Sequence, residues 1–401
     1  FEHTGGWTDG AIAVWTAART VKYVTTDGVY RPDQGAVEGS VVCIENGSVV
    51  EVRDSVPGDA DPLYDGEGYA LPGFVDAHSH GPIRPGEGDQ LGQMRADPAV
   101  QAIRAANNLG RDLRAGTTTM RTMGCEHRLD LRLRESERAG ELAAPRLLPC
   151  GGHLTPTNGH GHALTSTDGP EACRQRVRDL LAAGAHHVKY FATGGVSSGA
   201  GSLDRAPYSD AEAEAIVSEA HRQGVHVATH AHGGAGARQA IEAGVDSIEH
   251  AAAFDAELVD LLAESGAHAV GTFSILHDPN GIVGGDADDP DVMARVEEAR
   301  ASERESWEHI LDADVPVALG TDSMHGNLAD EAAHLVDYGV SPETAIRAVT
   351  SEAARAARAE HAGTLEPGTH GDVVVVAEHP AENIETLADP LAVVKGGERV
   401  V

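Results

Sequence analysis

Short apolar runs recur through the middle of the chain, and each is followed by a longer stretch whose apolar residues have helical spacing. The stretch from Ser209 to Gly224 is an example, because Ser209 and Glu212 can form a capping box and the glycine can end the helix. Eight such strand and helix units predict an α/β protein with a (β/α)8 TIM barrel over residues 73–364. The predicted strands are 74–78, 117–122, 146–151, 187–192, 225–230, 247–251, 268–273 and 315–322.

A doubly wound open sheet is the alternative that has the same alternation of strands and helices. No predicted strand leads into a G-x-G-x-x-G or P-loop sequence, which such nucleotide-binding sheets carry. The glycine-rich segment at 194–201, "GGVSSGAG", lacks the lysine and the following hydroxyl residue of a phosphate loop. We therefore favour the barrel and interpret this segment as an active-site loop.

The two ends of the chain have a different pattern, with short valine-rich runs, turns and little helix. Asn46-Gly47 lies between two such runs and predicts a β-hairpin, and Gly396-Gly397 predicts a second turn. We therefore expect the two ends, residues 1–72 and 365–401, to pair into one small β-sandwich domain.

Acidic residues dominate the charge of this 401-residue chain, with 63 Asp and Glu against 30 Lys and Arg and a formal net charge of −33. The negative electrostatic field of such a chain repels nucleic acids and anionic membranes. Repulsion among the acidic residues themselves is tolerated best where salt screens it. No apolar stretch approaches the roughly 18 residues of a membrane span. The four cysteines lack C-x-x-C spacing, and the first residues have no apolar signal core, so we expect a cytoplasmic protein.

Polar residues stand at the ends of the predicted strands, which is where barrel enzymes carry their chemistry. His78 and His80 are one residue apart, so in a strand both imidazoles face the same side and can bind a divalent metal. Each residue alone could be a core histidine or a helix cap, but Lys189 is one of only three lysines and lies within a strand. Together they predict a metal site. The six candidate ligands are His78, His80, Lys189, His230, His250 and Asp322.

Several segments of the chain resemble the amidohydrolase superfamily. They are "LPGFVDAHSH", "VKYFATGGV", "HVATHAHG", "SIEHA" and "LGTDS". Within the superfamily they are similar to the imidazolonepropionase-related branch, which holds many Xaa-Pro dipeptidases and N-acyl-amino-acid carboxypeptidases. The resemblance covers nearly the whole chain. It implies two divalent metal ions, for which the ligand types favour zinc, and a carboxylated Lys189 that bridges them. In this arrangement His78, His80 and Asp322 bind one ion, and His230 and His250 bind the other.

The resemblance also implies the reaction, which is hydrolysis of an amide or peptide bond by a metal-bound hydroxide. Asp322 would pass the proton to the leaving nitrogen, and His160 would bind the carbonyl oxygen or the substrate. Asn158 stands where the family often has glycine. We expect a small-molecule or short-peptide substrate, a dipeptide or N-acyl amino acid that loses its C-terminal amino acid. Its carboxylate would be bound by His160, Arg205 and Tyr208, the last two just before a predicted helix N-terminus.

Two other functions remain open at this point. One is hydrolysis of a cyclic amide or deamination, although many deaminases of the superfamily lack the lysine that corresponds to Lys189. The other is a catalytically inactive barrel that serves as a binding or assembly protein, which would be expected to lose metal ligands, whereas this chain retains all six. We also expect a homo-oligomer.

Overall fold

Parallel strands form the middle of the molecule, as the sequence predicts. The computed structural model describes residues 21–161, 164–196 and 203–401. All eight predicted strands are present, and the third is divided into two short strands by residues 150–152. They are β8 (Phe74–Ser79), β9 (Thr117–Thr122), β10 (Arg146–Pro149), β11 (His153–Leu154), β12 (Val188–Phe191), β13 (Val227–Gly233), β14 (Ser247–Ala253), β15 (His268–Gly271) and β16 (Val317–Leu319).

The order of these strands follows the sequence. One sheet has the order β10-β9-β8, the other has the order β11-β12-β13-β14-β15-β16, and every neighbouring pair is parallel. A parallel bridge between Ser79 and Asp322 connects the end of β8 to the segment after β16. The chain is therefore an α/β protein whose strand order is the one that an eight-stranded barrel requires.

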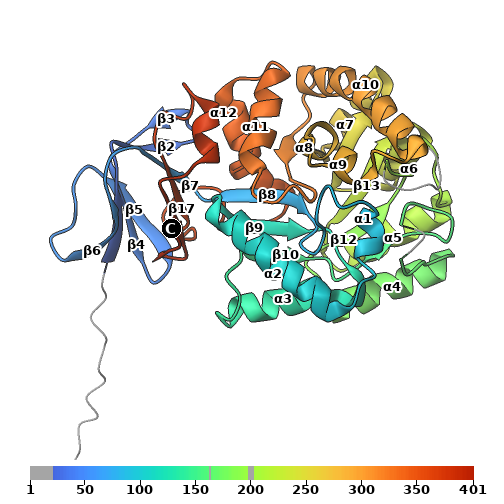
Figure 1. Cartoon of the computed structure of the whole chain (residues 1–401), viewed down its shortest axis with the longest axis horizontal. Helices are drawn as coiled ribbons and strands as arrows, with labels where there is room; N and C mark the ends of the chain where they lie inside the picture. The colour runs from blue at the N-terminus through green and yellow to red at the C-terminus, as the bar shows by residue number, and fades with distance from the viewer. Residues whose placement is uncertain (1–20, 162–163, 197–202) are drawn as a thin grey trace, which may run out of the picture.

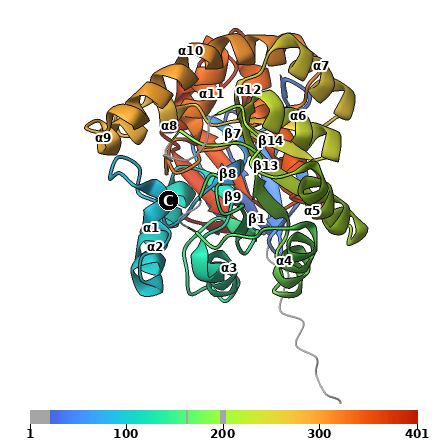
Figure 2. The ribbon, with the colours of Figure 1, turned by 90° about the vertical axis from the view of Figure 1, so that its right-hand side faces the viewer.

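Helices surround the strands in a ring when the molecule is viewed along the strands (Figure 2). The predicted helix after Ser209 is present, and the Ser209 backbone N–H donates to Glu212 Oε2 at 2.9 Å. The helices are α1 (Gln90–Gln93), α2 (Pro98–Arg114), α3 (Leu129–Arg138), α4 (Pro170–Ala182), α5 (Asp210–Arg222), α6 (Gly234–Ala243), α7 (Ala256–Ser265), α8 (Ser274–His277), α9 (Ile282–Asp286), α10 (Pro290–Asp312), α11 (Leu328–Asp337), α12 (Pro342–Ala348) and α13 (Ser351–Ala356), with two 3₁₀ helices, η1 (Glu126–Arg128) and η2 (Ile384–Ala388).

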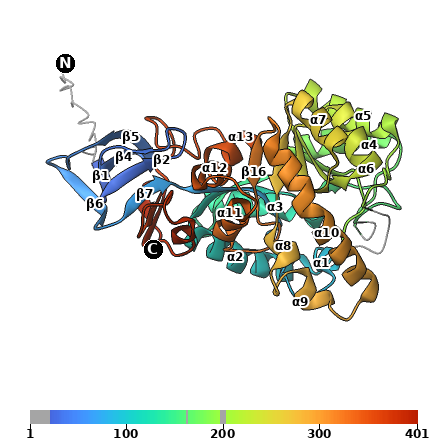
Figure 3. The ribbon, with the colours of Figure 1, turned by 90° about the horizontal axis from the view of Figure 1, so that it is seen from above.

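Strands from both ends of the chain pair in one sheet, which lies to one side of the parallel strands (Figures 1 and 3). This sheet has the order β19-β18-β17-β7-β2-β3, and Leu71 of β7 pairs with Val374 of β17. A second sheet has the order β5-β4-β1-β6, and its β4–β5 hairpin turns at the predicted Asn46-Gly47. The strands are β1 (Val21–Thr25), β2 (Gly28–Arg31), β3 (Ala36–Val37), β4 (Val41–Glu45), β5 (Ser48–Arg53), β6 (Ala60–Asp65), β7 (Tyr69–Pro72), β17 (Val373–Val376), β18 (Ala392–Lys395) and β19 (Glu398–Arg399).

One buried apolar cluster draws on both of these sheets, since Val24 and Val42 of the second sheet pack with Val373 and Val394 of the first. β7 runs directly into β8 through Gly73, so the parallel strands begin beside this β region and their C-terminal ends point away from it (Figure 1). The predicted chemistry therefore lies at the far end of the molecule.

The four cysteines are buried free thiols. In the described part of the chain, no helix has both the length and the apolar character needed to cross a membrane.

Candidate metal centre

All six predicted metal ligands line one cavity at the C-terminal ends of the parallel strands. They come from β8, β12, β13 and β14 or from the residues just after β8 and β16. His160, the predicted catalytic histidine, lines the same cavity. The structure thus brings together His78, His80, His160, Lys189, His230, His250 and Asp322.

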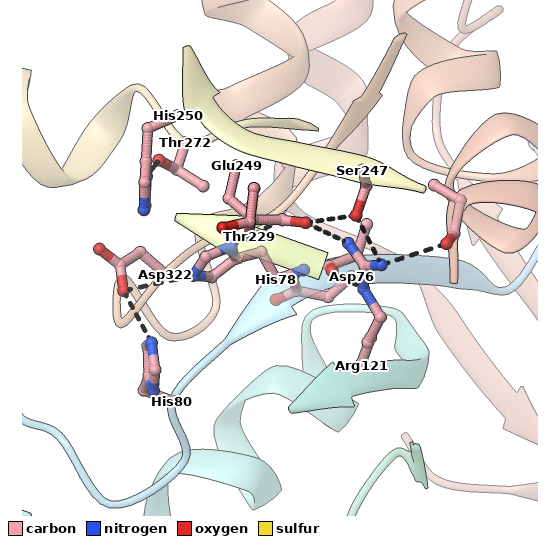
Figure 4. Close-up of polar contacts among 12 residues, drawn as sticks. Asp76, His78, His80, Arg121, Thr229, Ser247, Glu249, His250, Thr272 and Asp322 are labelled. Atoms are coloured by element: carbon pink, nitrogen blue, oxygen red, sulfur yellow. Dashed lines mark hydrogen bonds and ion pairs between the residues drawn. The ribbon is translucent and has the colours of Figure 1, made fainter. Parts of the chain in front are cut away.

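His78, His80 and Asp322 form the first half of the cluster (Figure 4). Asp322 Oδ1 lies 3.7 Å from His80 Nε2 and 4.0 Å from His78 Nε2. Two atoms that both bind one zinc ion at about 2.0–2.2 Å can be up to about 4 Å apart. These three side chains can therefore hold one ion with little movement.

The backbone around Asp322 forces this convergence. Asp322 has a φ of 55°, which is uncommon for a residue with a side chain and is found most often at functional sites. Its N–H donates to the His78 carbonyl at 2.8 Å, and its own carbonyl accepts from the His80 N–H at 2.6 Å. Gly320 is required just before this turn, since a Cβ there would lie 2.4 Å from the His78 nitrogen.

His230 and His250 form the second half of the cluster, and their ring centroids are 4.6 Å apart. His230 Nε2 donates to the Gly194 carbonyl at 3.0 Å, and His250 Nδ1 lies 2.7 Å from Thr272 Oγ1. Such hydrogen bonds fix the orientation of a ring and leave its other nitrogen for a metal. Burial lowers the pKa of both rings well below the ordinary value, which keeps them in the neutral, ligating form.

Lys189 lines the same cavity, and its side chain is fully buried. It acts electrostatically on the histidines of both halves. Its Nζ has no hydrogen-bond partner among the described residues, and neither does His78 Nε2. A buried ammonium without a partner is costly, and burial lowers the pKa of Lys189 to about 8. These unsatisfied atoms fit a site built for metal ions.

A model of the "Amidohydrolase family" matches residues 69–400. The chain belongs to the amidohydrolase family. It is therefore a hydrolase that acts on carbon–nitrogen bonds, and metal dependence is typical of this family.

Individual relatives of this amidohydrolase are enzymes. An ochratoxinase from Aspergillus niger is 30% identical over 370 residues, which covers 82% of this chain and 75% of the relative. An imidazolonepropionase from Streptomyces coelicolor is 26% identical over 379 residues, covering 85% and 86%. A crystal structure of a Xaa-Pro dipeptidase with bound methionine in the active site superposes with a TM-score of 0.86 at 26% identity, covering 95% of this chain and 99% of that one. These relatives confirm the superfamily branch that the motifs predicted.

Glu249 is a site residue of this amidohydrolase that sequence reasoning missed. Its carboxylate accepts from His78 Nδ1 at 2.8 Å, from Arg121 Nη2 at 2.9 Å and from Ser247 Oγ at 2.6 Å (Figure 4). Both Glu249 and Arg121 are fully buried. Glu249 therefore orients the His78 ring so that Nε2 faces the metal cluster. Its position next to His250 in "SIEHA" was the available signal.

The predicted substrate ligands are only partly brought together. The His160 ring stacks on His230 at 4.5 Å, and Gly195 makes room for it, since a Cβ there would lie 2.2 Å from the ring. Arg205 is exposed and is not among the residues lining the cavity. Tyr208 is buried away from the cavity, and its hydroxyl donates to the Thr167 carbonyl at 3.0 Å. The placement of Arg205 and Tyr208 therefore does not support substrate binding by either residue.

The wall of the cavity beyond the cluster is mostly apolar. Lys189 is the only lysine or arginine among the described residues that line it. The predicted active-site loop at 194–201 lies partly outside the described residues. The apolar side chains are Ile83, Leu91, Met94, Phe191, Val196, Ile275, Leu276 and Ile282.

Proposed function

We propose that this amidohydrolase is a binuclear metal enzyme that releases a C-terminal amino acid from a dipeptide or an N-acyl amino acid. The observation that carries the proposal is Lys189, a fully buried lysine whose Nζ has no hydrogen-bond partner among the described residues. It shares a cavity with the four predicted histidine ligands and Asp322. A structural lysine would have an anionic partner at hydrogen-bond distance. A carboxylated lysine presents anionic oxygens that can bind two cations.

The residues would divide between two ions. His78, His80 and Asp322 would hold the first, His230 and His250 would hold the second, and carboxylated Lys189 would bridge them. Zinc suits this mixture of imidazole and carboxylate ligands. When bound, the ions supply Lewis acidity that polarises the scissile carbonyl and lowers the pKa of water.

The side chains of the protein would then orient the substrate and move the proton. The Asp322 side chain is 16% exposed at the cavity, so its carboxylate can reach both the attacking water and the leaving nitrogen. Burial raises the pKa of Asp322 to about 6. This value lets the group accept and return a proton near neutral pH. The His160 ring stacks on the His230 ring. From this position His160 would bind the carbonyl oxygen or another part of the substrate.

The apolar wall supports a substrate with an apolar side chain, because burial of such a group stabilises binding and excludes water. Ile275, Leu276 and Ile282 form one part of this wall. The relatives support the same class, since one is a Xaa-Pro dipeptidase with bound methionine and another is an ochratoxinase.

Several structural expectations belong to the same proposal. The Ser79–Asp322 bridge supports closure of the parallel strands into one barrel over residues 73–364. The shared apolar cluster supports a β-sandwich from residues 1–72 and 365–401. Free cysteines fit a reducing cytoplasm, and we propose that the enzyme is a homo-oligomer.

A substrate panel tests the proposed activity. Xaa-Pro dipeptides and N-acyl derivatives of apolar amino acids are each assayed beside their C-terminal amides, with imidazolonepropionate as the cyclic amide. We expect turnover of the acids, weaker turnover of the amides, and loss of activity in Asp322→Asn. His153→Gln is the control, since His153 is a buried polar residue that pairs with Lys189 in the neighbouring strand but does not line the cavity.

Equal turnover of acids and amides would contradict recognition of a free carboxylate. Activity confined to the cyclic amide would place the enzyme with its imidazolonepropionase relatives instead.

A further inference from the structure

Three histidines lie together at the opposite end of the parallel strands from the catalytic cluster. His186 and His187 directly precede β12, and His226 directly precedes β13. One ring nitrogen from each of the three lies within 4.8 Å of the others. The same spacing holds for the ligand atoms of His78, His80 and Asp322. The distances between potential ligand atoms therefore meet the same limit in the three histidines as in the three predicted catalytic ligands.

The hydrogen bonding of these rings is incomplete. Both nitrogens of His187, Nδ1 of His186 and Nε2 of His226 are buried without a hydrogen-bond partner among the described residues. The His187 side chain is fully buried, and that of His226 is 2% exposed. Buried polar groups in folded proteins nearly always have a partner, so four such nitrogens in one place need an explanation.

Aromatic packing explains only part of this arrangement. The rings of His187 and His226 stack with centroids 5.3 Å apart, and the rings of His186 and His226 meet edge to face at 5.4 Å. Phenylalanine or leucine would fill the same space without burying unsatisfied nitrogens. The chemistry of imidazole is therefore what distinguishes this cluster.

We propose that His186, His187 and His226 form a second metal site, which binds one divalent cation of the zinc class. Three neutral imidazoles suit Zn²⁺ and similar borderline metals, and they do not suit Ca²⁺ or Mg²⁺, which prefer oxygen ligands. This site is separate from the proposed catalytic cluster and does not depend on it.

An ion can reach the cluster from solvent. A cavity of about 610 Å³ is lined by His186 and His226 and opens to the surface beside the β region. Water from this cavity could complete a tetrahedral site, in which three protein ligands leave one position open. Glu137 and Glu360 line the cavity together with Arg138, Arg146 and Arg358. Ion pairs with Lys395, Asp372 and Asp246 neutralise Glu137, Arg146 and Arg358 in turn, so the lining carries little net charge.

Three arginines act electrostatically on the cluster: Arg121, Arg134 and Arg358. Arg121 is close enough to act electrostatically on His187 and His226. Its guanidinium is paired with the Glu249 carboxylate at 2.9 Å, so the pair is neutral overall. Arg358 is likewise paired with the Asp246 carboxylate at 2.6 Å, whereas Arg134 donates to the Gly184 carbonyl. The charges of Arg121 and Arg358, which oppose an incoming cation, are therefore balanced by carboxylates.

An ion at this site would join two strands that carry catalytic residues. The Val188 N–H donates to the His226 carbonyl at 3.0 Å, and the same strands continue to Lys189 and His230. A metal bound to both strands would favour the folded state by mass action. Its expected role is structural, with the hydrolytic residues at the other end of the strands.

Zinc analysis of three proteins tests the site. The wild-type enzyme is compared with His186→Gln/His226→Gln and with a control, His268→Gln. His268 begins β15, and its Nε2 is also buried without a hydrogen-bond partner among the described residues, but it is not part of the cluster. After equilibration with a small excess of zinc and removal of free metal, the double variant should contain one zinc per chain less than the wild type. The control should match the wild type, and kcat/KM of the double variant should be retained. Equal zinc content in all three proteins would overturn the proposal.

Crystallography of the wild-type enzyme keeps the proposal testable if the double variant does not fold. Anomalous diffraction at the zinc edge should show a peak between the three histidines at stoichiometric zinc. No peak there while zinc occupies the catalytic cluster would overturn it, and so would a peak that appears only in large zinc excess. A peak at this end with none among the catalytic ligands would support the second site and contradict the binuclear proposal.

Discussion

Replacement of Glu249 by glutamine should separate two roles of one buried carboxylate. Glu249 holds the His78 ring through Nδ1 and neutralises the Arg121 guanidinium. The substitution keeps the shape of the side chain and removes its charge. It should therefore weaken metal binding through His78 and destabilise the fold through Arg121.

The magnitudes follow from the burial of the pair, in which both side chains have no exposure. Removal of one partner of a buried ion pair costs about 3–5 kcal/mol, which is a large fraction of the roughly 5–15 kcal/mol that stabilises a typical domain. Loss of a carboxylate that orients a metal-ligating histidine lowers metal affinity or activity by about 10–100-fold.

Two further variants separate these effects. Arg121→Met/Glu249→Gln removes the unpaired charge, so it should recover part of the free energy of unfolding but not the metal affinity. Recovery is partial because Arg121 also donates to the carbonyls of Ala77 and Ala356. Glu331→Gln is the control, because this carboxylate is equally buried but bonds only to the backbone N–H groups of Phe273 and Ser274.

The assays are urea denaturation of the metal-free proteins and competition for zinc with a chelator. If Glu249→Gln binds zinc with wild-type affinity, the reasoning about His78 is wrong. If it unfolds at the wild-type urea concentration, the reasoning about the Arg121 pair is wrong.

Three other predictions follow from the same site and from the charge of the chain. Reactivation of the metal-free enzyme by zinc, at a constant concentration of dissolved CO2, should accelerate as the pH rises through about 8, because the neutral Lys189 amine is the form that reacts with CO2. A rate that is constant from pH 7 to 9 under these conditions would contradict this. Asp322→Asn should lower kcat by about 10²–10⁴-fold, and a loss below tenfold in steady-state assays would exclude it as the proton carrier. The thermal midpoint should rise between low and molar KCl, because the net charge of −33 is screened over about 3 Å at 1 M salt, and an unchanged midpoint would refute this.

The sequence predicted the parallel strands and the cavity lining well because both depend on local patterns. Apolar runs located the strands, and the period of two placed His78 and His80 on one face. The barrel rule then placed Lys189, His230 and Asp322 at the same end, where the structure has them.

Glu249 was missed because the backbone departs from the regular alternation of a strand. Under that alternation, Glu249 and His250 would face opposite sides. His250 has a φ of 76° and Ala251 a φ of 48°, and this local turn allows both side chains to reach His78.

Tyr208 shows the limit of arguments from proximity along the sequence. Its position before a helix N-terminus suggested an anion site, but its hydroxyl is taken by the carbonyl of Thr167, 41 residues away. The cluster of His186, His187 and His226 was also missed, since it depends on the pairing of two strands that are separated by a helix.

A crystal structure of the enzyme purified without chelator, with diffraction data at the metal absorption edge, tests the central claim most directly. The account predicts two anomalous peaks within the cluster of His78, His80, His230, His250 and Asp322, with continuous density for a carboxylated Lys189 between them. A single peak in active enzyme, or a bare Lys189 amine beside two occupied positions, would contradict it.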